Sequence, residues 1–215
     1  MPERISPLFF PGPAGRLEGV LHHDPDQVPA RMGVVCHPHP LYGGTLHNKV
    51  VFRAAQVLVE AGLPVLRFNF RGVNHSHGRH DGGRGERDDL RAALDFMVER
   101  FGQLPIFVAG FSFGAGIALE VAPGDRGVPA VLAIAPPIQG KSYPELAACP
   151  KPKAVVQGGA DTLCPPEHLD QEFPRWAEPK LRVDVPGASH FFDRQLGELR
   201  AAVRRCFDWA VELGA

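Results

Sequence analysis

Short apolar runs alternate with longer amphipathic segments along most of the chain, and this alternation constrains the fold more than any other feature. Apolar runs of strand length lie at residues 17–21, 32–36, 64–68, 105–109, 130–134, 153–156 and 181–185. Apolar residues at helical spacing lie between or after them, at residues 48–61, 86–101 and 194–213. Because strands separated by helices pair in parallel and are covered on both faces, we predict a three-layer α/β/α sandwich around a mostly parallel sheet.

The length of the chain suits one domain. With 215 residues, we expect residues 1–215 to fold as a single domain. The stretch at 135–152, between two predicted strands, is too short for a helical cap and has room only for a short helix near residues 143–147. We therefore expect the fold to carry no cap domain.

Composition excludes several classes of partner. The formal net charge is −1, which offers no electrostatic basis for binding nucleic acid or a membrane surface. No apolar run approaches the ~18 residues of a membrane span, and residues 1–7 lack the apolar core of a signal peptide. The four cysteines have no paired spacing, which argues against a disulfide framework or a structural zinc site. We expect a cytoplasmic protein; whether it forms a homodimer stays open.

One motif carries a nucleophile. Residues 110–114 read GFSFG and directly follow the predicted strand at 105–109. The G-x-S-x-G spacing at a strand-to-helix turn is typical of the nucleophile elbow, whose tight turn raises the serine hydroxyl above the sheet edge. Glycine and serine are also common in ordinary turns. The motif therefore points to Ser112 only if an acid and a histidine follow in the right places.

An aspartate and a histidine follow Ser112 in the chain, in that order. Asp161 lies in a glycine-containing loop after the strand at 153–156, and His190 lies in the loop after the strand at 181–185. Because parallel strands end at one edge of the sheet, Ser112, Asp161 and His190 are expected to meet there. His190 would take the serine proton, and Asp161 would orient the imidazole. The plainer alternatives are a turn or helix-cap aspartate and an ordinary loop histidine.

Acyl transfer also needs donors for the developing oxyanion. One expected donor is the backbone N–H of Phe113, which follows the nucleophile. The other comes from the loop HPHPLYGGT at 37–45, whose two prolines have no N–H. We favour the amide of Leu41, with His39 second. Apolar walls of the substrate pocket are expected from Tyr42, Phe111, Phe113, Phe191 and Phe192.

A histidine cluster offers a rival, metal-based interpretation. Residues 75–81 read HSHGRHD, and residues 37–39 form a second H-x-H pair. The order H-x-H-x-x-H-D does not match the H-x-H-x-D-H pattern of metallo-β-lactamase-type hydrolases, and a metal site needs further ligands from distant loops. We expect no metal and no organic cofactor, and a surface loop at 72–85 beside the active site.

These motifs together resemble the α/β-hydrolase superfamily, and more narrowly the small capless bacterial hydrolases related to the dienelactone hydrolase group. The matching segments lie at 37–44, 67–73, 110–114, 158–161 and 187–192. One departure is Asn74, where relatives usually have glycine; asparagine tolerates positive φ better than most residues. Dienelactone hydrolases use a cysteine nucleophile, so the serine at position 112 does not imply that activity.

The sequence predicts a serine hydrolase of carboxylesterase type that acts on small-molecule acyl esters through an acyl-Ser112 intermediate. Peptidase, amidase and thioesterase activities on the same triad remain open. An alternative of another class is a catalytically idle binding protein of the same fold, although such proteins usually lack a triad member. The natural substrate and its pathway are not indicated.

Overall fold

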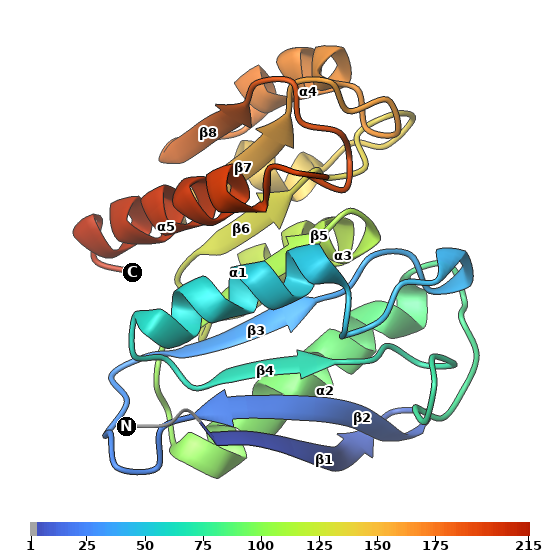
Figure 1. Cartoon of the computed structure of the whole chain (residues 1–215), viewed down its shortest axis with the longest axis vertical. Coiled ribbons are helices and arrows are strands. Elements are labelled where there is room, and N and C mark those ends of the chain that lie inside the picture. Colours follow the sequence, from blue (N-terminus) through green and yellow to red (C-terminus); the bar gives the residue numbers. More distant parts are fainter. Residues whose placement is uncertain (1–3) are drawn as a thin grey trace.

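The computed structural model describes residues 4–215. Residues 1–3, part of the segment considered for a signal peptide, lie outside the described residues. Within the described chain, the strands form one sheet in the order β1-β2-β4-β3-β5-β6-β7-β8 (Figure 1). Their bounds are β1 Arg4–Gly12, β2 Gly15–His23, β3 Met32–Cys36, β4 Val65–Phe68, β5 Ile106–Phe111, β6 Val131–Ile134, β7 Lys153–Gly158 and β8 Lys180–Val185.

The sheet is mostly parallel, as predicted. Strands β4, β3, β5, β6, β7 and β8 pair in parallel, whereas β1 pairs antiparallel with β2 and β2 antiparallel with β4. The sequence did not predict β1, because Pro7 and Pro11 interrupt its pattern. Proline is tolerated in a strand at the edge of a sheet, where its missing N–H breaks no ladder.

Two helical layers cover the sheet and confirm the three-layer sandwich. Helices α1 (Lys49–Glu60) and α5 (Leu196–Glu212) pack together on one face, and α2 (Arg84–Phe101) and α3 (Phe113–Val121) on the other (Figure 1). Side chains alternate along β5: Phe107 and Ala109 join the core under α1 and α5, whereas Ile106 and Val108 join the core under α2 and α3. This alternation follows from the two-residue period of a strand.

Short elements complete the chain. A further helix, α4 (Pro166–Glu172), was not predicted, and four 3-10 turns are present in the described chain: η1 Pro40–Tyr42, η2 Ala122–Gly124, η3 Pro144–Ala147 and η4 Phe173–Arg175. Between β6 and β7 the described chain contains only η3, near the position expected for a short helix, so no cap is inserted there. None of the described helices is both long and apolar enough to cross a bilayer.

The parallel arrangement places four loops at one edge of the sheet. The loops that follow β3, β5, β7 and β8 all leave from the carboxyl ends of neighbouring parallel strands. In open α/β sheets this edge is where ligands bind. Helix α1 begins at the same edge, where the Asn48 side chain accepts a hydrogen bond of 2.9 Å from the Val50 N–H.

Candidate active site

Ser112 lies in the turn between β5 and α3 in a strained conformation, with φ of 53° and ψ of −117°. Its backbone N–H donates to the Ile134 carbonyl over 2.9 Å. A Cβ on Gly110 would lie 2.3 Å from the Gly114 carbonyl oxygen, and a Cβ on Gly114 would lie 2.5 Å from the His37 carbonyl oxygen. Both flanking positions therefore require glycine, and the turn holds the Ser112 side chain at the sheet edge.

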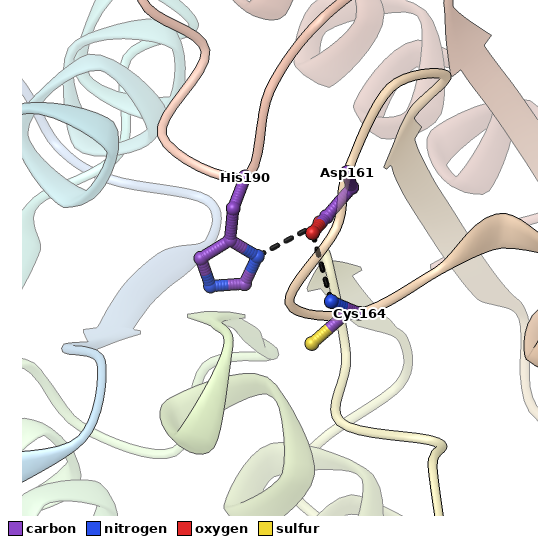
Figure 2. Close-up of side chains that lie close together, drawn as sticks. All are labelled: Asp161, Cys164 and His190. Atoms are coloured by element: carbon purple, nitrogen blue, oxygen red, sulfur yellow. Dashed lines mark hydrogen bonds and ion pairs between the residues drawn. The ribbon is translucent and has the colours of Figure 1, made fainter.

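The structure brings Ser112, His190 and Asp161 together in one hydrogen-bonded chain. The Ser112 hydroxyl lies 3.0 Å from His190 Nε2. On the other side of the ring, His190 Nδ1 lies 2.8 Å from Asp161 Oδ2 (Figure 2). Asp161 and His190 are buried, with 2% and 5% of their surface exposed. This order of contacts allows the imidazole to take a proton from the hydroxyl while the carboxylate holds the opposite nitrogen.

Asp161 is oriented by its own loop. Its Oδ1 accepts hydrogen bonds from the N–H groups of Leu163 (2.9 Å) and Cys164 (2.8 Å), the second of which Figure 2 shows. The turn role considered for this aspartate is thus present, and it leaves the other oxygen free to face His190. Phe111 packs against the His190 ring, with ring centroids 5.0 Å apart. The acid and the base are therefore held from several sides.

The loop after β3 does not support the preference for Leu41 as an oxyanion donor. The Leu41 N–H donates to the imidazole Nδ1 of His39 over 3.2 Å, and the Leu41 side chain is 70% exposed. His39, by contrast, lines the cavity that also contains Ser112. On the opposite side, Phe113 is the first residue of α3, and first-turn N–H groups have no partner within their own helix.

A cavity of about 350 Å³ opens beside the hydroxyl. Of the side chains expected in the pocket, Tyr42 and Phe191 line this cavity, whereas Phe113 is not among its lining residues. Phe111 and Phe192 do not line it either, since both are fully buried: Phe111 lies beneath His190, and Phe192 belongs to the core under α1 and α5. The other residues that line the cavity are Pro38, His39, Gly43, Gly44, Asn48, Ser112, Leu163 and His190.

Leu163 was missed as a pocket residue, although the sequence carried a weak signal for it. It is a large apolar side chain two residues after Asp161, and it is 58% exposed. Asn48 was missed because its position before an apolar run indicates a helix cap, a role that it also fills. The Phe111 error arose because alternation along β5 turns its last side chain under the site instead of into it.

The histidines of residues 75–81 do not converge. His80 Nδ1 lies 2.7 Å from the Glu86 carboxylate, while Glu86 itself is fully buried. The loop at 72–85 is mostly exposed and reaches the site through His80, whose ring lies 4.9 Å from that of His39. Asn74 adopts a φ of 47°, the left-handed conformation that asparagine tolerates.

Among the described residues, the group that could offer three metal-ligating atoms is Asp161, Cys164 and His190 (Figure 2). Burial, followed by the nearby Asp161 charge, raises the pKa of the Cys164 thiol to about 12. Asp161 Oδ2 and His190 Nδ1 already face each other at 2.8 Å. The hydrogen bonds of Asp161 and His190 instead suit an acid and base pair.

Comparison with known proteins gives consistent matches. A model of the serine aminopeptidase S33 family matches residues 33–154. Uncharacterized protein RP471 of Rickettsia prowazekii (strain Madrid E) is 36% identical over 205 residues, covering 91% of this chain and 86% of that protein. The structure of an alpha-beta serine hydrolase homologue from Coxiella burnetii is 40% identical with a TM-score of 0.88, covering 93% of this chain and 96% of that chain. The structure of XC6422 from Xanthomonas campestris, described as an a/b serine hydrolase without lid, is 35% identical with a TM-score of 0.88, covering 98% of this chain and 97% of that chain.

Proposed function

The chain belongs to the α/β-hydrolase superfamily, within the serine aminopeptidase S33 family whose model it matches. We propose that it is a serine hydrolase of carboxylesterase type that cleaves small acyl esters. The observation that carries the proposal is the chain of contacts from the Ser112 hydroxyl through His190 to Asp161, at 3.0 and 2.8 Å. Serine is a weak nucleophile at neutral pH, and an adjacent oriented base activates it.

The proposed reaction has two halves. His190 Nε2 accepts the Ser112 proton as the oxygen attacks the ester carbonyl, and the N–H groups of Phe113 and His39 stabilise the resulting oxyanion. The C–O bond to the alcohol then breaks, and His190 returns the proton to the leaving alcohol. His190 then takes a proton from water as the water oxygen attacks the acyl carbonyl. The C–O bond to Ser112 breaks, His190 returns the proton to the Ser112 oxygen, and the carboxylic acid leaves.

The cavity favours esters over peptides with a free amino terminus. Recognition of an ammonium group calls for a nearby carboxylate. Among the described residues that line the cavity, none is aspartate or glutamate, and Asp161 is hidden behind His190. The apolar walls, such as Leu163 and Phe191, instead suit an uncharged acyl group.

Hydrolysis of p-nitrophenyl acetate tests the proposal. Ser112→Ala is expected to lower kcat by a factor on the order of 10⁴ to 10⁶, because the covalent step is lost. His190→Ala is expected to be nearly as damaging, and the double variant no worse than Ser112→Ala alone, because the residues act as one unit. Activity of Ser112→Ala close to that of the wild type would refute the mechanism.

Three further experiments distinguish the esterase from a binding protein, a metal-dependent hydrolase and an amidase or peptidase. A fluorophosphonate probe should label the folded wild type and not Ser112→Ala, whereas an unreactive wild type would favour a binding protein. EDTA should leave activity unchanged, whereas its loss would favour a metal-dependent reaction. Matched acetyl ester, thioester and anilide substrates should show the highest kcat/KM for the ester; a preference for the anilide would indicate an amidase or peptidase.

A further inference from the structure

The His39 imidazole holds the loop that carries its own backbone N–H. His39 Nδ1 accepts the Leu41 N–H over 3.2 Å, and the His39 carbonyl accepts the N–H groups of Tyr42 and Gly44, each over 3.1 Å. Proline on either side of His39 fixes the neighbouring φ angles. The His39 N–H shares its peptide unit with the Pro38 carbonyl, which accepts the His37 Nδ1–H over 2.6 Å. That bond orients the peptide unit on the N-terminal side of His39, while the bonds to the His39 ring and carbonyl hold the chain on its C-terminal side.

The His39 ring also contacts Phe113, the residue that carries the other proposed oxyanion donor. The centroids of the two rings lie 5.0 Å apart. His80 packs on both rings, at 4.9 Å from His39 and 5.5 Å from Phe113. Glu86, in the first turn of α2, holds His80 at 2.7 Å and also accepts the Gly83 N–H at 2.8 Å. Glu86, which is buried on α2, thus holds His80 against the His39 ring.

The hydrogen bond to Leu41 requires an unprotonated Nδ1. Partial burial, followed by the neighbouring His80, lowers the pKa of His39 below its ordinary value. In the neutral ring, the hydrogen bond from the Leu41 N–H assigns the lone pair to Nδ1 and the proton to Nε2.

We propose that the His39 side chain is a positioning residue, which acts by accepting the Leu41 N–H and thereby aims the His39 backbone N–H at the oxyanion. This inference rests on the proposed esterase function. Because an oxyanion develops only in the transition state, loss of the acceptor should lower kcat far more than it changes KM. Misdirecting one donor is expected to cost about 10- to 100-fold in kcat, less than deleting it outright.

Three substitutions at one position separate the acceptor from the ring. Asparagine places an oxygen where Nδ1 lies relative to Cβ and has no ring; phenylalanine keeps a ring without an acceptor; alanine has neither. On p-nitrophenyl acetate we expect His39→Phe and His39→Ala to lose about 10- to 100-fold in kcat with KM within about 3-fold, and His39→Asn to stay within about 5-fold of the wild type. His47→Ala is the matched control, since His47 is an exposed histidine on the same loop, and it should behave as the wild type.

Each outcome decides between clear alternatives. Full kcat in His39→Phe, or a loss in His39→Asn equal to that of His39→Ala, would overturn the acceptor role and assign the effect to ring packing. Thermal unfolding of every variant identifies misfolding, and if His39→Ala does not fold, the comparison of asparagine with phenylalanine still decides. Failure of this inference and failure of the proposed function give different results: an active Ser112→Ala variant would refute the esterase mechanism, whereas insensitivity at position 39 with an inactive Ser112→Ala would refute only this inference.

Discussion

Histidines at two positions of one short loop show how burial assigns different roles to the same residue type. His37 is fully buried: its Nδ1–H donates to the Pro38 carbonyl over 2.6 Å, and its Nε2 accepts the Phe70 N–H over 3.0 Å. His39 is half-buried and lines the cavity. The H-x-H pair that suggested a metal site is thus occupied by backbone contacts, and His37 has no nitrogen left for a ligand.

The buried His37 predicts a loss of stability in acid. Burial lowers its pKa to about 4, whereas the unfolded chain keeps a value near 6.5. Between these values the unfolded state binds a proton that the folded state does not, so the free energy of unfolding falls as the pH drops from 6.5 towards 4, by about 3 kcal/mol in all. Urea unfolding at pH 7 and pH 4.5 measures this loss.

His37→Asn supplies the comparison, since it keeps a donor for the Pro38 carbonyl and does not titrate. The variant is expected to be less stable at pH 7, and its further loss at pH 4.5 should be smaller than that of the wild type by about 2 kcal/mol. Equal losses in the two proteins would mean that other groups cause the acid sensitivity.

At the scale of elements, the junction of β5 and α3 determines where the Ser112 hydroxyl, the proposed nucleophile, lies. The strand ends at Phe111, the helix begins at Phe113, and the residue between them takes a positive φ. The turn is closed so tightly that backbone carbonyls occupy the space in which side chains at 110 and 114 would lie. The position of Ser112 thus depends on glycine at residues 110 and 114, and the sequence motif specifies both.

Gly110→Ala should therefore damage both stability and activity. Its Cβ would lie 2.3 Å from the Gly114 carbonyl oxygen, which belongs to the backbone and moves only if the turn opens. We expect a loss of about 2–4 kcal/mol in unfolding free energy and at least a 10-fold loss in kcat. Gly124→Ala is the control, because a Cβ there meets no atom within 4 Å. Similar stability and turnover in the two variants would argue against a tightly closed turn.

At the scale of the whole molecule, the uncovered site is the defining feature. No cap lies between β6 and β7 in the described chain, and the cavity beside Ser112 holds about 350 Å³. At about 30 Å³ per small heavy group, this volume takes roughly a dozen heavy atoms. Exposed apolar side chains at its rim, Tyr42, Leu163 and Phe191, extend the wall towards solvent without closing over it.

This shape predicts a limit on acyl length. Across p-nitrophenyl esters, kcat/KM should be high from acetate to about hexanoate and at least 10-fold lower for palmitate, whose chain has no walls to replace water beyond the rim. Leu163→Ser should lower kcat/KM more for hexanoate than for acetate. Leu213→Ser, at an exposed leucine after α5, serves as the control. A palmitate ester cleaved as well as hexanoate would contradict the prediction.

The layers, the mostly parallel sheet and the loops that carry Ser112, Asp161 and His190 could be predicted from the amino-acid sequence. These features follow from local signals, namely apolar periodicity and turn residues, and from the rule that parallel strands share one carboxyl edge. Strand β1 escaped prediction because its role depends on being at an edge, which is a property of the assembled sheet.

Which side chains face the cavity could be read only from the folded chain. Whether Phe111 lines the pocket or supports His190 depends on packing between elements distant in sequence. Whether the Leu41 N–H faces a substrate or the His39 ring depends on how the backbone turns into η1. The pairing of His80 with Glu86 likewise depends on where α2 meets the loop before it. Residue type and spacing predict which reaction the residues of a loop can support. The direction of the backbone N–H groups in that loop depends on the contacts that the folded chain makes around it.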